Sequence, residues 1–444
     1  MSKTIRIFEH ETLRVGQKLR SVDGAESFLT QRHVDALARF NDTHSQRYFG
    51  VGYQRIGAQH FVGYVQVGEL GIEILPKADR LVAREDQRLR WRNALLEMLR
   101  VATGLRLHSP TSAMQSVARA SLMELVAMRF IEEVERLLHD GLVKGYRSEE
   151  SSSSAFRGRL LVRENLRENL VRADRFFVRY TTFDRDVLVN QVLGAAVAVL
   201  GSLPLSSALR ARIAVCAERF QDVSTIRVAA ATFERITTTR RTERYRSALV
   251  FARMILQQHV PELRSGAAPV FALLFDMNVL WERYVAALFK RARVPGVEVS
   301  TQEARPFWKA SGNTAKTVRP DIVLRDANTG AAVLVADTKW KVLETPTPAD
   351  ADLKQMFVYN ELFGASRSVL IYPGTGSEAH GARGSFVNRG HDCELVQLGL
   401  FAPSGISTAL VQEEVRTLVA RFAPVSGVGS SAKQSEAYGK QAVR

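Results

Sequence analysis

Asp321, Asp337 and Lys339 are the residues of this chain whose types and spacing best suit a chemical reaction. Asp337 and Lys339 are two positions apart, so in a strand their side chains point to the same face of a sheet. Two carboxylates suit Mg²⁺, a hard cation that takes oxygen ligands and keeps several waters. A lysine can orient or help deprotonate the attacking water and stabilise phosphate charge. This combination predicts metal-dependent hydrolysis of phosphodiester bonds.

Two adjacent strands must position these residues. Segments 319–324 and 333–340 are rich in β-branched and aliphatic residues and are separated by the turn-forming residues 326–330. An Asp-x-Lys sequence often occurs by chance, and then it usually lies at a solvated strand end. Residues 333–336, however, are apolar on both faces, as in a central strand, where an acidic residue at the end is more often functional. We therefore expect Asp321 to meet Asp337 on one face of a sheet.

Two predicted helices flank these strands. The helix at 348–364 places Gln355 and Tyr359 four residues apart, hence on one face. The helix at 275–291 places Glu282 in the middle of an apolar stripe. A buried unpaired carboxylate is unfavourable, so Glu282 either pairs with a basic residue or faces a metal-binding cleft. We favour the cleft.

This order of elements resembles the PD-(D/E)xK nuclease fold, and the glutamine–tyrosine helix resembles its RecB-like branch. By that resemblance Asp321 and Asp337 would bind Mg²⁺, and Glu282 and the carbonyl group of Thr338 would be further candidate ligands. Lys339 would be the catalytic lysine. Gln355 and Tyr359 would contact the DNA backbone or support the site.

More specifically, the chain resembles the McrC nuclease subunits of McrBC-type restriction systems, which cut DNA containing modified cytosine. The resemblance runs from about Phe156 to the end of the nuclease domain, and a further segment, 71–77, resembles the amino-terminal part of longer members. Its other segments are Phe156–Leu160, Phe183–Asn190, Phe275–Asn278 and Leu370–Pro373. One departure is Asp337, where many members of the broader superfamily have glutamate; either carboxylate can bind the metal.

A partner is also implied by the resemblance, because McrC-like proteins work with a GTP-hydrolysing AAA+ ring, McrB, which they stimulate. The chain has no Gly-x-x-x-x-Gly-Lys-Ser/Thr motif; the glycine-rich segments 374–377 and 427–430 lack the lysine. We therefore expect GTP to be bound by the partner and not by this chain.

Composition agrees with a DNA-binding protein. The 444 residues carry a formal net charge of +15, which favours a polyanionic partner, although ribosomal and membrane-surface proteins share this bias. Two distant cysteines argue against structural zinc, a disulfide framework and an iron–sulfur cluster. No segment has the roughly 18 consecutive apolar residues of a membrane span. We expect a cytoplasmic protein without membrane contact.

The expected fold class is α+β. We predict a small β-rich domain at 1–85, a mainly helical partner- or DNA-contacting domain at 86–265, an α/β nuclease domain at 266–424 and a disordered tail at 425–444. The polar residues 149–154 predict an exposed loop between helices. The arginines and aromatics of 156–185 suit either DNA contact or a subunit interface.

The function expected from the sequence is Mg²⁺-dependent DNA cleavage as the nuclease subunit of a GTP-driven restriction complex. Two alternatives stay open. One is an adaptor that mainly activates an NTPase ring; the other is a stand-alone DNA repair nuclease of RecB type, which would cut without a GTPase.

Overall fold

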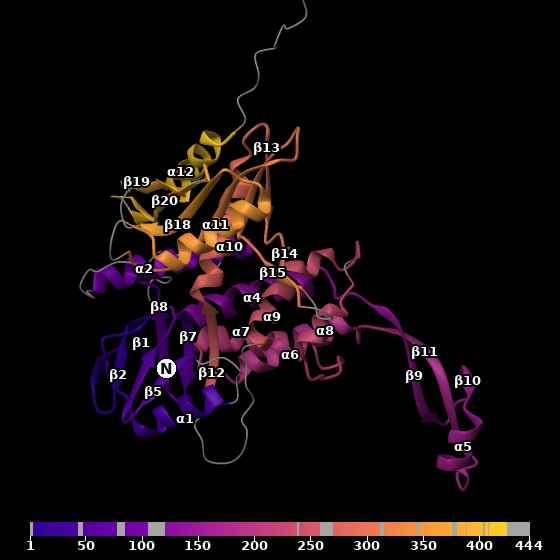
Figure 1. The fold of residues 1–444 in the computed structure, drawn as a ribbon. Helices are drawn as coiled ribbons and strands as arrows, with labels where there is room; N and C mark the ends of the chain where they lie inside the picture. The colour runs from indigo at the N-terminus through magenta and orange to yellow at the C-terminus, as the bar shows by residue number, and fades with distance from the viewer. Residues whose placement is uncertain are drawn as a thin grey trace, which may run out of the picture. The chain divides into compact units, whose positions relative to one another are not determined.

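The computed structural model has the mixed α+β fold that the sequence predicts (Figure 1). It divides into two compact units, Met1–Trp281 and Glu282–Arg444. The predicted tail at 425–444 lies outside the described residues. The structure describes residues 3–42, 48–77, 85–104, 120–237, 239–257, 270–310, 315–343, 347–374, 380–387, 389–402, 405–406 and 408–423.

The first unit is built on a four-stranded sheet. In spatial order its strands are β1 (Lys3–Phe8), β8 (Leu70–Leu75), β7 (Phe61–Val67) and β12 (Val270–Asp276). The strands predicted near the amino terminus and on both sides of the turn at 68–71 are confirmed. Gly63 in β7 allows β12 to approach closely, because a Cβ atom there would lie 2.0 Å from the carbonyl oxygen of Leu273.

The strand β12 differs from the expectation in two ways. It pairs antiparallel with β7, from Val270 opposite Val67 to Asp276 opposite Phe61. It therefore belongs to the sheet of the first unit, whereas the sequence-based division placed it in a domain beginning at residue 266. The following helix α10 (Met277–Ala292) begins two residues later than predicted, because residues 275 and 276 complete the strand.

The buried carboxylate of Glu73 ties this sheet to two helices, α2 (Glu85–Thr103) and α4 (Leu122–His139). Glu73 accepts hydrogen bonds from Arg6 at 2.7 Å, from Arg92 at 3.0 Å and from the backbone N–H of Leu122 at 3.0 Å. Burial alone would raise the pKa of Glu73, but the charges of Arg92 and Arg6 hold it below its ordinary value. The carboxylate of Glu73 on β8 thus orients the strand β1 and the helices α2 and α4.

The helix α4 follows the predicted apolar stripe. Its buried face includes Leu125, Phe130 and Val134, and a capping box of Ser121 and Glu124 begins it. Glutamates and arginines pair along its outer side, as expected for a solvated face. The helices that accompany it are α6 (Leu188–Gly201), α7 (Ser207–Glu218) and α9 (Arg246–Gln257).

The predicted exposed loop at 149–154 is wrong. These residues lie in or next to β9 (Gly145–Ser153), which pairs antiparallel with β11 (Phe176–Asp184) over nine positions. Opposite charges face each other across the two strands, as in Glu150 and Arg179 at 2.6 Å. Composition alone predicts a loop for a polar segment. This segment forms a strand because it pairs with β11, a strand distant in the sequence.

We call residues 145–184 the arm. Between its two long strands lie the short β10 (Arg159–Leu160) and the helix α5 (Val162–Asn169), and Figure 1 shows β9 and β11 side by side with α5 near their turn end. The arm interrupts the region that the sequence predicts to be helical.

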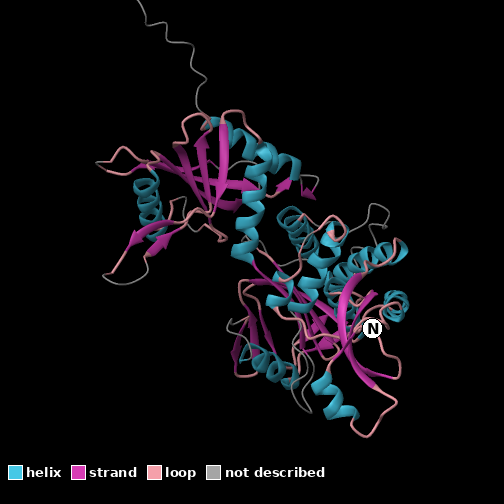
Figure 2. Cartoon of the chain, turned by 90° about the vertical axis from the view of Figure 1, so that its right-hand side faces the viewer, coloured by secondary structure: helices cyan, strands magenta, loops and turns pink. Residues whose placement is uncertain are grey.

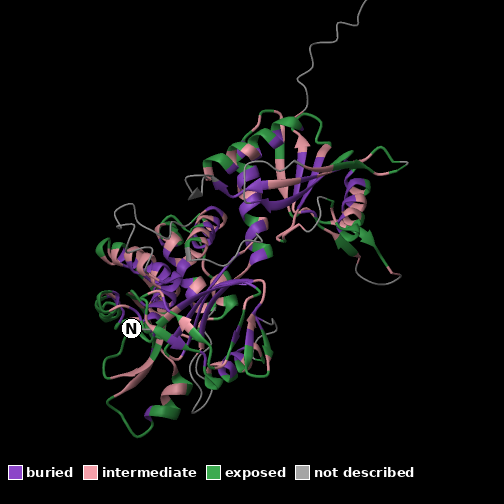
Figure 3. Ribbon diagram, turned by 90° about the vertical axis from the view of Figure 1, so that its left-hand side faces the viewer, coloured by how far each residue is buried: buried purple, intermediate pink, exposed green. Residues whose placement is uncertain are grey.

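The second unit is built on a six-stranded mixed sheet. In spatial order its strands are β13 (Val297–Thr301), β16 (Ile322–Asp326), β17 (Ala332–Thr338), β18 (Arg367–Gly374), β20 (Asp392–Gly399) and β19 (His380–Ser385). The predicted pair of strands around the turn at 326–330 is confirmed as the antiparallel pair β16 and β17. β17 is the third of the six strands, and its residues 334–337 are buried. Figure 3 shows buried residues along strands of both units.

Helices pack beside this sheet (Figure 2). α11 (Asp350–Phe363) packs on β17 and β18, and α12 (Thr408–Arg421) packs on β20. α11 ends where Gly364 adopts a left-handed conformation with φ 67°, close to the predicted end. Among the described residues, no helix is long and apolar enough to cross a membrane.

Candidate active site

The antiparallel pairing of β16 and β17 brings the first two predicted residues together. Asp321 directly precedes β16, whose first residue, Ile322, lies opposite Ala336 of β17. The Oδ2 atom of Asp321 accepts hydrogen bonds from the backbone N–H and the hydroxyl group of Thr338, each at 2.7 Å. The start of one strand is thus fixed to the end of the other.

Asp337 is a buried carboxyl group with a strongly shifted pKa. Its side chain is only 5% exposed. Burial and the negative charge of Asp321 together raise the pKa of Asp337 to about 6, although the charge of Lys339 acts in the opposite sense. A carboxylate held beside a second carboxylate in a buried place is typical of functional sites.

Lys339 lies immediately beyond β17, where its backbone N–H donates to the carbonyl oxygen of Ile371 at 2.9 Å. Its Nζ atom is 2.7 Å from Oδ2 of Asp337 and donates to Oε1 of Gln355 at 2.9 Å. The ammonium group is therefore held between the central strand and helix α11.

Gln355 and Tyr359 share one face of α11, as their spacing predicts. The Nε2 atom of Gln355 donates to the hydroxyl oxygen of Tyr359 at 2.6 Å and lies 3.4 Å from Oδ1 of Asp337. The hydroxyl group of Tyr359 donates to the carbonyl oxygen of Arg319 at 3.2 Å. Burial raises the pKa of Tyr359 to about 12, so the phenol stays neutral at physiological pH.

Glu282 lies near the carboxylates of Asp321 and Asp337. Burial raises the pKa of Glu282, and the charge of Asp321 raises it further; Arg283 acts in the opposite direction. Within the described part of the chain, its hydrogen-bond partner is the side-chain amide of Gln302, at 2.8 Å. The metal-binding cleft that the sequence favours at Glu282 stays a prediction.

Gln302 is a site residue that the sequence analysis missed. It follows β13, and its Nε2 atom reaches both Oε1 of Glu282 and Oδ1 of Asp321, the latter at 3.1 Å. Its backbone adopts a left-handed conformation with φ 56°, which is uncommon for a residue other than glycine. A lone glutamine after a strand carries no sequence signal, and only the pairing of β13 with β16 reveals its place.

Asp352 is a second missed residue. It accepts hydrogen bonds from Lys341 at 2.6 Å and from the hydroxyl group of Tyr372 at 3.0 Å, and its other oxygen lies 3.7 Å from Nζ of Lys339. Burial tends to raise the pKa of Asp352, but these partners hold it below its ordinary value. The carboxylate of Asp352 therefore adds a stable negative charge near Lys339.

The carboxylates could hold a divalent cation together with water. Among the described residues, no group of three or more His, Cys, Asp or Glu side chains forms a ready metal cage. Mg²⁺ does not need one, because it usually binds through one or two carboxylates and keeps several waters. Asp321 and Asp337 supply these, and burial together with the charge of Asp321 raises the pKa of Asp337 even though Lys339 lies 2.7 Å away.

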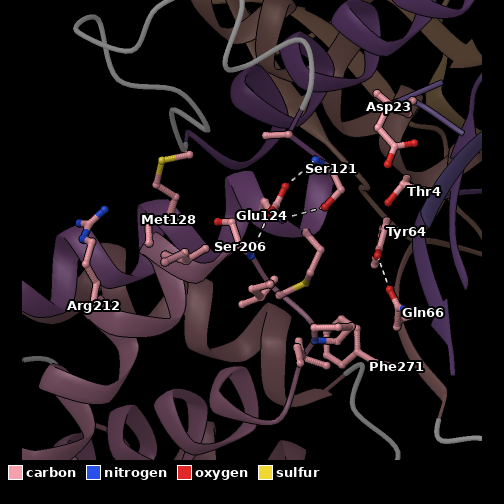
Figure 4. A pocket seen from close by; sticks show the side chains of 18 residues that line it. Thr4, Asp23, Tyr64, Gln66, Ser121, Glu124, Met128, Ser206, Arg212 and Phe271 are labelled. Atoms are coloured by element: carbon pink, nitrogen blue, oxygen red, sulfur yellow. Dashed lines mark hydrogen bonds between the residues drawn. The ribbon is translucent and has the colours of Figure 1, made fainter. Parts of the chain in front are cut away.

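A cavity lies elsewhere, among described residues of the first unit (Figure 4). It has a volume of about 630 Å³ and a mostly apolar lining that includes Met123, Met128 and Phe271. Its polar groups bind one another: Tyr64 donates to Gln66, and Glu124 accepts from the backbone of Ser206 at 3.1 Å. It offers no cluster of carboxylates, so we place the chemistry in the second unit.

Comparisons with known proteins agree on one family. Residues 56–373, more than half of the chain, match the sequence model of the family described as "McrBC 5-methylcytosine restriction system component". No curated protein matches the chain.

Two solved structures are similar. One is from a refined half-complex of the tetradecameric assembly of Thermococcus gammatolerans McrB AAA+ hexamers with bound McrC; it is 18% identical with a TM-score of 0.64, over 94% of this chain and 99% of that chain. The other is from the cryo-EM structure of the Thermococcus gammatolerans McrBC complex, 21% identical with a TM-score of 0.45, over 66% of this chain and 88% of that chain. The first shows a shared fold.

Proposed function

Because the chain belongs to the family of McrBC 5-methylcytosine restriction system components, we propose that it is the DNA-cleaving subunit of a GTP-driven restriction complex. Its substrate is DNA containing modified cytosine, its cofactor is Mg²⁺, and its second unit is a PD-(D/E)xK endonuclease domain. The observation that carries the proposal is the position of Lys339, within 3 Å of both Asp337 and Gln355.

Each side chain has a role in this reaction. Asp321 and Asp337 hold Mg²⁺, with Glu282 and the carbonyl group of Thr338 as further candidate ligands. Mg²⁺ bound there would polarise the scissile phosphate and lower the pKa of the attacking water. Lys339 orients that water and stabilises the charge that develops on the phosphate.

Gln355 and Tyr359 are positioning residues. The amide of Gln355 accepts from Lys339 and donates to Tyr359, and Tyr359 is anchored on the carbonyl oxygen of Arg319, two residues before Asp321. This chain of hydrogen bonds keeps the lysine in one orientation relative to the carboxylates. DNA backbone contact is a second role that we propose for both residues.

The partner that we propose is an AAA+ GTPase ring. The Thermococcus gammatolerans chain with a similar fold comes from an assembly of McrB AAA+ hexamers with bound McrC. In our proposal the ring binds GTP and this chain stimulates its hydrolysis, in the cytoplasm, where DNA and GTP are both present.

Reconstitution tests the proposal. Methylated and unmethylated DNA are incubated with the chain, with and without GTP and an AAA+ GTPase ring of the McrB type. We expect cleavage of methylated DNA only with Mg²⁺, GTP and the ring, and its loss in Asp337→Ala and Lys339→Ala variants that still bind the ring. Cleavage that survives either substitution would refute the site, and cleavage without a GTPase would favour a repair nuclease.

The arm favours a second candidate function, an adaptor that mainly activates the ring. In α5 the polar face binds the strands: Asn165 accepts from the backbone of Phe177 at 2.7 Å, and Asn169 accepts from Ser152 at 2.9 Å. The apolar side chains Val162 and Leu166, four residues apart, stay exposed.

A helix that binds its own protein through asparagines and exposes aliphatic side chains is typical of a protein-binding surface. GTPase assays of the ring with wild-type and Asp337→Ala protein separate the two functions. Stimulation by a wild-type chain that never cleaves DNA would favour the adaptor.

A further inference from the structure

A hairpin without an assigned role connects two residues of the candidate active site. Its strands are β14 (Arg305–Trp308) and β15 (Lys316–Val318), and they pair antiparallel. It begins three residues after Gln302 and ends three residues before Asp321. The backbone N–H of Gln302 donates to the carbonyl oxygen of Asp321 at 3.1 Å, so these two residues close its base.

The base of the hairpin is fixed to helix α11. Arg305 donates to the carbonyl oxygen of Leu362 at 2.7 Å, and its guanidinium group lies 4.4 Å from the ring centroid of Phe363. Glu303 binds Arg325 at 2.8 Å in the same region. The hairpin therefore has a set direction relative to the carboxylates.

Farther out, two aromatic side chains are exposed. Phe307 and Trp308 are each 54% exposed. Phe307 occupies a β-bulge, which breaks the alternation of the strand and re-aims its side chain. Exposing two large neighbouring aromatic side chains to water is unfavourable, so they are suited to a partner that covers them.

The charge of this segment identifies the chemistry of that partner. Residues 304–320 contain four basic residues, Arg305, Lys309, Lys316 and Arg319, and no acidic residue. Lys309, Lys316 and Arg319 are exposed, and Nζ of Lys316 lies 5.5 Å from the ring centroid of Trp308. Exposed aromatics beside exposed basic groups fit a nucleic acid strand, whose bases stack on rings and whose phosphates pair with lysine and arginine.

We propose that the β14–β15 hairpin binds DNA next to the candidate active site, with Trp308 and Phe307 stacking on unpaired bases and Lys309, Lys316 and Arg319 pairing with phosphates. The inference rests on the proposed function, since it takes the substrate to be DNA. Trp308 follows Gln302 by six positions, so the rings lie at most about 20 Å along the hairpin from its base. That is about six nucleotides along a strand at the spacing of B-DNA.

Unpaired bases are the preferred target because stacking requires an accessible base face. In a continuous duplex these faces are already stacked on neighbouring base pairs. The hairpin should therefore prefer DNA with a locally opened segment over a fully paired duplex of the same sequence.

Binding experiments without cleavage test this proposal. Fluorescein-labelled DNA, either fully paired or with a short central bubble, is titrated with the full chain in EDTA, and anisotropy is recorded. We expect tighter binding to the bubble, and a loss of about tenfold in that affinity in Trp308→Ala. Trp308→Phe should retain most of it, because a ring remains.

Two controls separate stacking from charge. Lys316→Ala should weaken binding to both DNAs and reduce by about 1 the slope of log affinity against log salt concentration. Arg416→Ala removes the same charge from the exposed side of α12 and should change neither. Tyr53→Ala removes an aromatic side chain that is 89% exposed in the first unit and should leave bubble binding unchanged.

A base analogue reports stacking directly. Fluorescence of 2-aminopurine placed in the bubble should fall on binding of wild type and much less with Trp308→Ala. The inference is overturned if Trp308→Ala has the circular dichroism spectrum of the wild type and binds bubble DNA as tightly. A loss of affinity for a protein partner in that variant would not rescue it. DNA that binds through Trp308 but is never cleaved supports the hairpin and refutes the nuclease proposal.

Discussion

Gln302 binds Asp321 twice, through its backbone N–H to the carbonyl oxygen and through its side-chain amide to Oδ1, both at 3.1 Å. The same amide also reaches Glu282 at 2.8 Å. One uncharged side chain therefore sets the distance between two carboxylates that repel each other, at the base of the β14–β15 hairpin.

This geometry predicts a role for Gln302 in metal binding. Gln302→Ala should weaken Mg²⁺ binding about tenfold, as is typical when a group that orients a metal ligand is removed. Gln302→Asn is the matched variant, because asparagine keeps an amide and tolerates the left-handed backbone. Mg²⁺ titrations of cleavage, and of Mn²⁺ binding without DNA, provide the measurement; equal metal affinity in wild type and Gln302→Ala would contradict it.

A pH dependence follows from Asp337. Burial and the charge of Asp321 raise the pKa of Asp337 in the folded state from 3.8 to about 6. Without metal, protonated Asp337 therefore stabilises the fold at low pH, and this contribution to stability is lost as the pH rises from 3.8 to about 6. Mg²⁺ must displace this proton. Its affinity should therefore rise with pH until about 6 and then level off.

Calorimetric Mg²⁺ titrations across this pH window measure the effect. Glu282→Gln removes a second carboxyl group of the site whose pKa is raised, and the pH dependence should persist in that variant. An Mg²⁺ affinity that does not change below about pH 6 would rule out the assignment to Asp337.

Stability of the first unit should depend strongly on Glu73. Glu73→Ala leaves Arg6 and Arg92 buried without their carboxylate, so we expect the free energy of unfolding to fall by about 3–5 kcal/mol. Urea unfolding followed by circular dichroism measures this. Glu26→Ala, which breaks the exposed pair with Lys18, should change it by less than about 1 kcal/mol; similar losses in both variants would be inconsistent with the central role of Glu73.

The arm should contribute to partner binding. Replacing Val162 and Leu166 together by serine should weaken binding to the GTPase ring at least about tenfold, since two buried aliphatic side chains contribute about 1.5–3 kcal/mol each. Val215→Ser, at an exposed position of α7, is the control. Sedimentation or light scattering with the ring would show the loss, and an unchanged affinity would direct attention to another surface.

The sequence by itself determined the contacts that are local along the chain. Asp321, Asp337 and Lys339 meet because a short turn forces two neighbouring segments to pair, and Gln355 and Tyr359 share a face because four residues make about one helical turn. Periodicity and turn residues encode such contacts directly. The same rules located α4, α11 and the strands of the amino-terminal sheet.

Only the tertiary structure decided which distant segments pair. Gln302 reaches Asp321 because β13 lies beside β16, β12 joins β7 across some two hundred residues, and the polar segment at 145–153 becomes a strand because β11 pairs with it. Strand pairing depends on backbone hydrogen bonds that every residue can form, so the partner of a strand is not written in its own residues. The site therefore combines a local motif, visible in the sequence, with a support that exists only after folding.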